Sequence, residues 1–371
     1  MKTQRTTTLA VDPVRLKTLL QELIDIYSPT GKEEEVLHYV EEYLKGRNLP
    51  VVRQTIDENR FNLLVLPDDP DEMSLCFVGH LDTVPAHDLE DYGFYEEEDE
   101  VFGLGAADMK AGCAAMMEAF TVLGEQVKRL PSVGLALVVG EEEESDGAKA
   151  LMREYTFPWA IIGEPTNMMP CLGHYGYLEV LLRARGKRAH SSMPELGQNA
   201  VEHMLKLLLQ VSQFAASSSN ELVCNIRELS SSSGGFVVPD TCEAYLDFHL
   251  PPESRLDTIK AKLELLVEAA SESISGLEAS IRFEETHSGY HVSPERLFVR
   301  KLKKAYEELS LPWQPQDFRS HSDGNVLWAA GVDPIIIGPG RLETAHTSEE
   351  SVEFAQVVQA AQLYLAVALS L

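Results

Sequence analysis

The sequence is short of cysteine, and the cysteines it has are not arranged in pairs. Five cysteines are spread over 371 residues, and none of them forms a C-x-x-C motif. This pattern argues against a disulfide framework or a thiolate zinc site. It favours the reducing cytoplasm as the setting of the protein.

Positive charge and long apolar runs are also scarce. Lysine and arginine total 31 against 59 aspartates and glutamates, so the formal net charge is −28. Such an excess of negative charge argues against nucleic acid or an anionic membrane surface as the main partner. No apolar window of 18 residues predicts a membrane span, and the first residues lack the apolar core of a signal peptide.

The regular pattern that is present predicts an α/β fold. Short, continuous apolar runs alternate with segments of helical apolar spacing, which is typical of a largely parallel sheet sandwiched by helices. A polar, aromatic stretch over 88–100 predicts a loop or hairpin, and a Gly-rich turn precedes a helix near Met109. The expected strands end near 80, 139, 163 and 340, and the flanking helices cover 13–28, 34–46 and 352–371.

The middle of the chain has a different pattern, which predicts a second domain. Its elements follow the order strand, helix, strand, strand, helix, strand, which is the ferredoxin-like unit. A length of 371 residues also favours two domains over one. We expect a discontinuous first domain, 1–176 with 287–371, and an inserted α+β domain over 177–286.

Acidic and histidine side chains follow the predicted strands at their carboxyl ends. In open α/β sheets these ends form the edge at which ligands bind, so the side chains are expected to meet in one crevice. Each group taken alone is more often structural, and a run of glutamates is usually a solvated surface. The residues are His80, Asp82, Asp108, the run Glu141–Glu144, Glu164 and His346.

These residue types suit two metal ions that share a ligand. Imidazole and carboxylate groups bind Zn²⁺, Mn²⁺ or Co²⁺. One carboxylate would bridge the ions, and each ion would take one histidine and one further carboxylate. Asp82 lies two residues after His80 and could accept the second imidazole N–H of that residue. Two adjacent glutamates can supply one ligand and one general base.

In combination, the motifs resemble a known family of dinuclear zinc amidohydrolases and metallopeptidases. The family includes acetylornithine deacetylase, succinyl-diaminopimelate desuccinylase, aminoacylase-1 and glutamate carboxypeptidase, and the resemblance covers nearly the whole chain. It implies a zinc-peptidase-like catalytic domain and a lid or dimerisation domain. The matching motifs are G-H-L-D-T-V-P (79–85), G-x-G-A-A-D-M-K-A-G (103–112), E-E with S-x-G-A (145–148), G-E-P-T (163–166), G-x-x-A-H-S-S-M-P (186–194) and G-P-G…A-H-T (338–347).

The resemblance implies a role for each residue of the site. Asp108 matches the bridging carboxylate, His80 and His346 match the terminal ligands, and Asp82 orients His80. Glu164 completes the shell of the His80 metal. Counting back from S-x-G-A selects Glu141 as general base and Glu142 as ligand of the other metal. A slip by one residue, to Glu142 and Glu143, stays open.

The inserted domain departs from the family in its substrate-binding residues. His190 matches the histidine that reaches a neighbouring active site and polarises the scissile carbonyl, which implies a homodimer. His249 stands where many members have an arginine that holds the substrate carboxylate, and Phe236 stands where many have asparagine. Arginine binds carboxylates well. The candidates to replace it are Arg227, Arg319 and Arg341, and Asn199 is a further candidate for substrate binding.

The sequence therefore predicts a cytoplasmic, metal-dependent amidohydrolase with two divalent ions, zinc before cobalt or manganese. Its substrate is expected to be an N-acyl amino acid, attacked by a hydroxide held between the metals. A dipeptidase or carboxypeptidase of the same family is the main alternative. A metal-containing binding protein without activity is a third interpretation, motivated by His249 and Phe236.

Overall fold

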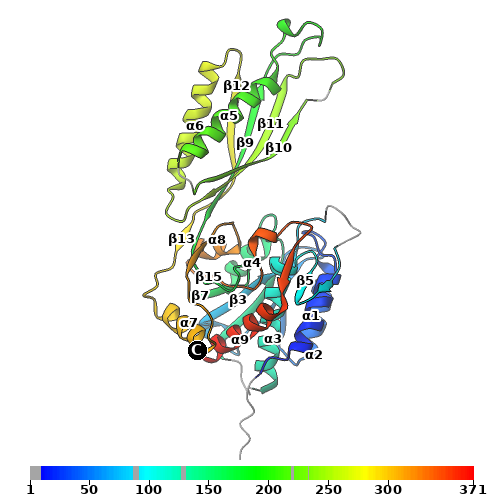
Figure 1. The fold of residues 1–371 in the computed structure, drawn as a ribbon, viewed down its shortest axis with the longest axis vertical. Coiled ribbons are helices and arrows are strands. Elements are labelled where there is room, and N and C mark those ends of the chain that lie inside the picture. Colours follow the sequence, from blue (N-terminus) through cyan, green and yellow to red (C-terminus); the bar gives the residue numbers. More distant parts are fainter. Residues whose placement is uncertain (1–9, 87–91, 127–130, 219–220, 233) are drawn as a thin grey trace, which may run out of the picture. The chain divides into compact units, whose positions relative to one another are not determined.

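The computed structural model describes the chain except for residues 1–9, 87–91, 127–130, 219–220 and 233. It divides into two compact units (Figure 1). The first unit comprises Met1–Leu172, Val292–Phe318 and Ser322–Leu371, and the second comprises Gly173–His291 and Arg319–His321. The second unit extends a few residues beyond the expected 177–286 on each side. Its short return segment, Arg319–His321, has no counterpart in the sequence prediction.

The first unit is built on a mixed sheet with a parallel centre. Its strands lie in the order β1-β2-β6-β3-β7-β15-β8, and β14 pairs with β8. The pairs β6–β3, β3–β7 and β7–β15 are parallel, while the strands at either edge are antiparallel. The bounds are β1 Val51–Thr55, β2 Phe61–Val65, β3 Leu75–His80, β6 Val133–Val138, β7 Trp159–Ile162, β8 Cys171–His174, β14 Gln316–Phe318 and β15 Asp333–Ile336.

Two groups of helices cover this sheet. One group packs α3 against α1 and α9, and the other packs α4 against α8. Both α3 and α4 contact the central strand β6. The bounds are α1 Pro13–Asp25, α2 Glu34–Gly46, α3 Ala111–Gln126, α4 Asp146–Glu154, α7 Leu297–Glu308, α8 Asp323–Ala329 and α9 Phe354–Leu369. The predicted α/β class, with a largely parallel sheet sandwiched by helices, is confirmed.

The core of the first unit lies directly under the strand ends that carry the candidate site. Every residue of β3 and β6 is buried, as their continuous apolar sequences predict. The ring of Phe77 on β3 contacts Phe120 of α3 and Tyr364 of α9, with centroids 5.8 and 5.5 Å apart. The hydroxyl of Tyr364 donates to the carbonyl of Ile337 just after β15. Helices α3 and α9 therefore hold β3 and the carboxyl end of β15 in place through these contacts.

Part of the acidic stretch before the Gly-rich turn forms a small three-stranded sheet with a segment near the end of the chain. Strands β4 (Tyr95–Glu97) and β5 (Glu100–Phe102) form a hairpin, and β16 (Ser351–Glu353) pairs with β5. Part of the predicted loop, 87–91, lies outside the described residues. The helix expected near Met109 begins at Ala111, because Ala106–Lys110 forms an irregular turn with non-helical backbone at Asp108 and Met109.

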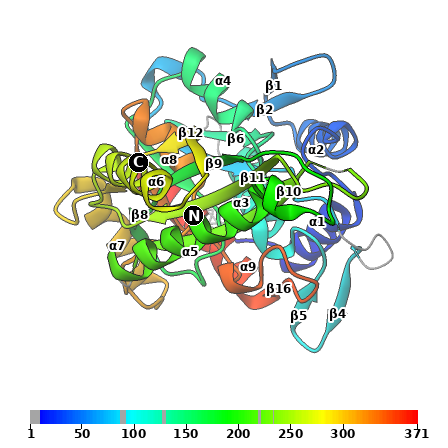
Figure 2. The same ribbon diagram turned by 90° about the horizontal axis from the view of Figure 1, so that it is seen from above.

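The second unit has the predicted ferredoxin-like topology. Its sheet has the order β10-β11-β9-β12, which can be followed in Figure 2. Every neighbouring pair of these strands is antiparallel. Helices α5 and α6 contact each other and pack on the sheet. The bounds are β9 Gly176–Arg185, α5 Ala200–Ser218, β10 Val223–Ser231, β11 Thr241–Leu250, α6 Leu256–Ser273 and β12 Glu278–His287, and the short β13 is Tyr290–His291. No helix among the described residues is long and apolar enough to cross a membrane.

Candidate metal centre

The parallel strands of the first unit bring the predicted ligands to one edge. His80 is the last residue of β3, and Glu164 follows the end of β7 by two residues. Glu141 and Glu142 lie in the turn between β6 and α4. Because these strands are parallel, their carboxyl ends share one edge of the sheet.

Asp108 lies between the two histidines. Its Oδ1 is 3.3 Å from Nε2 of His80, and its Oδ2 is 3.4 Å from Nε2 of His346. Around it are Glu164, with Oε1 3.6 Å from His80 Nε2, and Glu142, with Oε1 3.1 Å from His346 Nε2. Two ligand sets therefore share Asp108, and within each set the donor atoms lie within 4.8 Å of one another.

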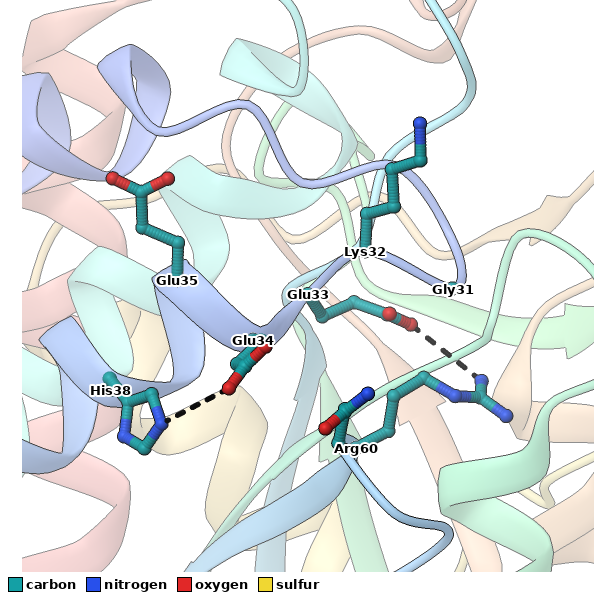
Figure 3. A pocket seen from close by; sticks show the side chains of 8 residues that line it. Gly31, Lys32, Glu33, Glu34, Glu35, His38 and Arg60 are labelled. Carbon is teal, nitrogen blue, oxygen red and sulfur yellow. Dashed lines mark ion pairs between the residues drawn. The ribbon is translucent and has the colours of Figure 1, made fainter.

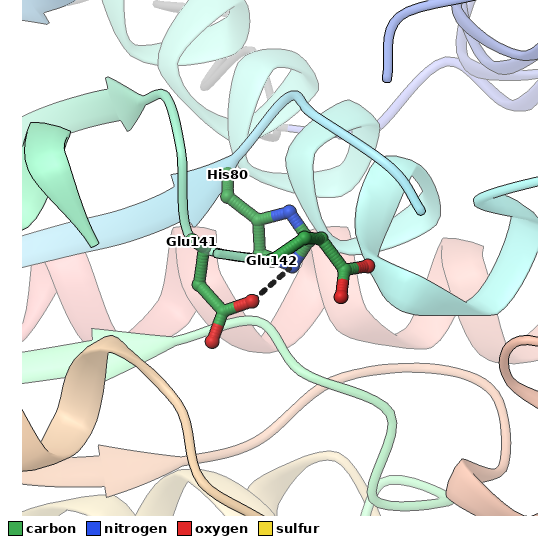
Figure 4. A group of neighbouring side chains, drawn as sticks. All are labelled: His80, Glu141 and Glu142. Carbon is green, nitrogen blue, oxygen red and sulfur yellow. Dashed lines mark ion pairs between the residues drawn. The ribbon is translucent and has the colours of Figure 1, made fainter. Parts of the chain in front are cut away.

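The turn after β6 separates the four glutamates into two pairs. Figure 4 shows Glu141 and Glu142 beside the ring of His80, and Glu141 Oε2 is 3.8 Å from His80 Nε2. Glu141 is buried, whereas Glu143 and Glu144 are exposed. The structure thus brings the pair selected by the S-x-G-A count to the cluster and leaves Glu143, which the alternative register needs, at the surface.

The donor set fits divalent cations. Oε1 of Glu164 is buried and has no hydrogen-bond partner among the described residues. Burial raises the pKa values of Glu141 and Glu164 well above the ordinary carboxyl value. Several carboxylates gathered in a buried site are costly unless positive charge is present. Two cations bound by imidazole and carboxylate groups would supply that charge.

Comparison with known proteins identifies the family. Residues 76–370 match the profile of Peptidase family M20/M25/M40.

The chain belongs to Peptidase family M20/M25/M40.

The family resemblance expected from the motifs is therefore confirmed, and this M20-family protein is a hydrolase that acts on peptide or amide bonds. It is 27% identical to a probable carboxypeptidase of Aspergillus terreus, over 93% of this chain and 83% of that protein. It is 26% identical to acetylornithine deacetylase of Vibrio parahaemolyticus, over 76% of this chain and 77% of that enzyme. The crystal structure of a tripeptidase from Staphylococcus aureus matches the fold with a TM-score of 0.81 at 22% identity, over 97% and 98% of the two chains.

Asp82 contacts His80 in this M20-family site, but the hydrogen bond is made by the backbone of Asp82 and not by its carboxylate. Nδ1 of His80 hydrogen-bonds the backbone carbonyl of Asp82 at 3.0 Å, while the carboxylate Oδ1 is 3.7 Å away. The carboxylate instead accepts the backbone N–H groups of Glu141 and Glu142 and the hydroxyl of Thr30. A carbonyl can only accept, so Nδ1 carries the proton and Nε2 is left for a metal. The carboxylate is occupied by three other donors.

Glu350 supports the M20 site and was missed from the sequence. Its buried carboxylate accepts the backbone N–H groups of Gly105, Ala107 and Asp108 at 3.1, 2.9 and 3.0 Å. These bonds hold the irregular turn that presents Asp108. Glu350 lies in the matched segment near His346, but exposed Glu349 stands beside it. The sequence alone offers no signal that separates the two.

Arg60 forms an ion pair with Asp146, the residue that follows the turn of the glutamates. It lies in a surface hollow beside the start of α2, where its Nη1 is 3.7 Å from buried Glu33 (Figure 3). The same guanidinium pairs with Asp57 at 2.6 Å and with Asp146 at 2.8 Å. Asp146 begins α4 directly after the turn. Arg60 therefore ties the end of the glutamate turn to the neighbouring loops.

Three of the remaining predicted residues, His190, His249 and Arg227, make their contacts within the second unit. His190 is exposed, and its Nδ1 hydrogen-bonds Ser192. The ring of His249 contacts Tyr177, and burial lowers the pKa of His249. Arg227 pairs with Glu179 and Asp247. All of these groups belong to the second unit.

Three further candidates have structural partners. The side-chain oxygen of Asn199 accepts the N–H groups at the start of α5, so its amide caps that helix. Arg319 lies over the ring of Tyr175, 5.8 Å from its centroid. Arg341, in the first unit, is 3.6 Å from Glu100. Substrate binding by these residues stays a prediction.

Proposed function

We propose that this enzyme hydrolyses the amide bond of an N-acyl amino acid with two divalent metal ions, zinc before cobalt or manganese. The observation that carries the proposal is the position of Asp108, whose two oxygens each lie beside a different histidine. His80 and Glu164 would complete one ligand set, and His346 with Glu142 the other. Asp108 would then be the shared ligand.

The chain's own residues would handle the proton. Bound divalent ions supply Lewis acidity, which polarises the amide carbonyl and makes a water easier to deprotonate. Glu141 is buried beside His80. The one group of possible ligands that contains it, with His80 and Glu142, lacks Asp108, so we place Glu141 outside the two sets that share Asp108. Its pKa is raised by burial, so its carboxylate accepts a proton readily and can return it to the leaving amine. We assign Glu141 as the general base and general acid.

The second unit would supply the donor that stabilises the oxyanion. We assign this role to His190, which is exposed and which the motif implies as the donor to the scissile carbonyl. Homodimerisation through this unit is supported by its uncovered edge strand β10 and by exposed Leu205 and Leu209 on the neighbouring helix α5. A cytoplasmic location is supported by five free cysteines.

A peptidase is the second candidate. The similarity to a probable carboxypeptidase over 93% of the chain favours it. Both candidates use the same metal site and differ only in what lies on the two sides of the scissile bond. A metal-containing protein without activity is disfavoured because a complete ligand set and a buried base would have no use in it.

A substrate panel tests the proposal. The purified enzyme is loaded with zinc, cobalt or manganese. It is then incubated with N-acetyl and N-succinyl amino acids, with dipeptides, and with longer peptides that report carboxypeptidase cleavage, and the release of free amine is measured. Metal-dependent turnover of N-acyl amino acids above that of peptides supports deacylation. Preference for peptides selects the second candidate. No metal-dependent turnover of either group overturns the proposed activity.

A further inference from the structure

A hollow in the first unit adjoins the candidate metal centre. It has a volume of about 590 Å³, within the range that takes a small organic group, and His346 forms part of its wall. Nε2 of the same imidazole is 3.1 Å from Glu142 and 3.4 Å from Asp108. A group seated in the hollow would therefore lie next to the bond that the centre cleaves.

The walls of the hollow are mostly apolar. Val84, Pro85 and Ala86 follow the strand end that carries His80, and Leu104 precedes the turn that carries Asp108. The rings of Tyr92 and Tyr95 complete the apolar part of the lining. Apolar and aromatic walls favour an occupant that loses apolar surface to water on binding.

Internal contacts hold these walls in place. The backbone N–H of Leu104 donates to the carbonyl of Tyr92, and the ring of Tyr92 lies 5.0 Å from that of Tyr27. The hydroxyl of Tyr27 accepts the backbone N–H of Ala86. Tyr95 stacks on Phe102 with their ring centroids 4.6 Å apart. The hollow is thus formed before a ligand enters it, which lowers the entropic cost of binding.

The described residues of the lining offer no unpaired charge to a charged ligand. Its carboxylate, Glu350, already accepts three backbone N–H groups. Its imidazole, His346, faces Asp108 and Glu142. No lysine or arginine is among the described residues of the lining. Burying an unpaired ammonium or carboxylate here would be costly.

We propose that this hollow is a specificity pocket for an uncharged branched or aromatic group beside the scissile amide, on either the acyl or the amino-acid side. The inference rests on the proposed hydrolase function. A pocket of this kind would make the enzyme disfavour substrates with a cationic side chain or an anionic acyl group at this position.

Two substrate series test the pocket in the metal-loaded enzyme. In the first, alanine carries acetyl, isovaleryl, benzoyl, succinyl or β-alanyl groups. In the second, N-acetyl is joined to alanine, leucine, phenylalanine, lysine or glutamate. In the series that faces the pocket, kcat/KM for apolar members should exceed that for charged members about tenfold or more, as expected for burying one apolar group. Charged members that match or exceed the apolar ones in both series overturn the inference.

Two variants locate the effect. Leu104→Lys should reverse the preference towards the succinyl or glutamate member, while Leu297→Lys makes the same change at a site that is 67% exposed in α7 and should leave the preference as it is. Tyr95→Ala alters a half-exposed wall residue and tests the pocket even if Leu104→Lys fails to fold. An unaltered preference in a folded Leu104→Lys or Tyr95→Ala protein contradicts the assignment.

Binding separates this inference from the proposed activity. Calorimetry on metal-loaded Glu141→Gln protein measures the affinity of both series without turnover. If apolar members bind Glu141→Gln more tightly but the wild-type enzyme cleaves none of the panel, the pocket is retained and the proposed activity is overturned. Turnover and binding that are equal for apolar and charged members overturn the pocket and retain the activity.

Discussion

The carboxylate of Asp82 accepts the backbone N–H of Glu142 at 3.1 Å. Its other oxygen accepts the N–H of Glu141 at 3.3 Å, and Thr30 donates its hydroxyl at 2.8 Å. One buried acid therefore fixes the turn that carries both the proposed base and a proposed ligand. Its backbone carbonyl meanwhile fixes the ring of His80.

Replacing Asp82 by alanine should loosen this turn. We expect metal affinity and kcat each to fall about 10–100-fold, the range for losing a partner that orients ligands. Inductively coupled plasma analysis and steady-state rates measure the two effects. Thr30→Val removes one of the three donors and should cause a smaller loss. Wild-type metal affinity and kcat in a folded Asp82→Ala protein would contradict this role, because the turn would then keep its conformation without the Asp82 carboxylate.

Gly112 allows helix α3 to approach the end of β7. A Cβ at this position would lie 2.2 Å from the carbonyl oxygen of Gly163, just before Glu164. Gly112→Ala should therefore lower the free energy of unfolding by about 1–3 kcal/mol, as overpacking does. Urea unfolding measures it. Gly46→Ala is the matched control, since its Cβ meets nothing within 4 Å; an equal effect of both changes would contradict the packing argument.

The strands of the first unit and the topology of the second could be predicted because their sequence patterns are local. The apolar run that ends at His80 predicts a buried strand, and the alternation over β9 and β11 predicts a half-buried sheet. The convergence of His80 and Glu164 could also be predicted. Each residue follows a strand that was expected to be parallel to the other, and the carboxyl ends of parallel strands lie at the same edge of a sheet.

Interactions that depend on tertiary placement could not be predicted. Which oxygen of Asp82 faces which donor depends on how the β6–α4 turn folds back. Glu350 and Glu349 have the same side chain, and only the fold buries one of them. The irregular turn at Ala106–Lys110 could not be predicted from the helical pattern that follows it. Its backbone is held by Glu350, which is distant in the sequence.

Buried Glu33 should make stability depend on pH. Its oxygens have no hydrogen-bond partner among the described residues, and burial raises its pKa to about 7. A carboxyl group that binds its proton more tightly when folded stabilises the protein fully below the unfolded pKa and ceases to do so as the pH rises through 7. Glu33→Gln should therefore raise the free energy of unfolding at pH 8, by about 2 kcal/mol, and change it little at pH 4.

Thermal unfolding of this variant at pH 4, 6 and 8 gives the comparison. The exposed neighbour Glu34 provides the control Glu34→Gln, which should have little effect at any of these values. A loss of stability at pH 8 in Glu33→Gln would mean that the ion pair with Arg60, at 3.7 Å, outweighs the cost of burying the charge.

The proposed dimer should depend on the face beside β10. Leu209 of α5 is 60% exposed, and α5 contacts β10. Leu209→Lys should shift the protein towards monomer in sedimentation velocity, and kcat should fall with it because His190 is expected to serve a neighbouring site. Leu265→Lys changes a residue of α6, which contacts β12 at the other edge of the sheet, and should leave the dimer intact. A fully active wild-type monomer would rule out this arrangement.

The most direct test of the account is turnover and metal content of Glu141→Gln, Glu142→Gln and Glu143→Gln, prepared and measured together. Glu141 is buried beside His80, Glu142 contacts His346, and Glu143 is exposed. We predict that Glu141→Gln keeps both metals and loses activity by about 10³-fold or more, that Glu142→Gln loses metal and activity, and that Glu143→Gln resembles wild type. Retained turnover in Glu141→Gln, or loss of metal in Glu143→Gln, would contradict the assignment.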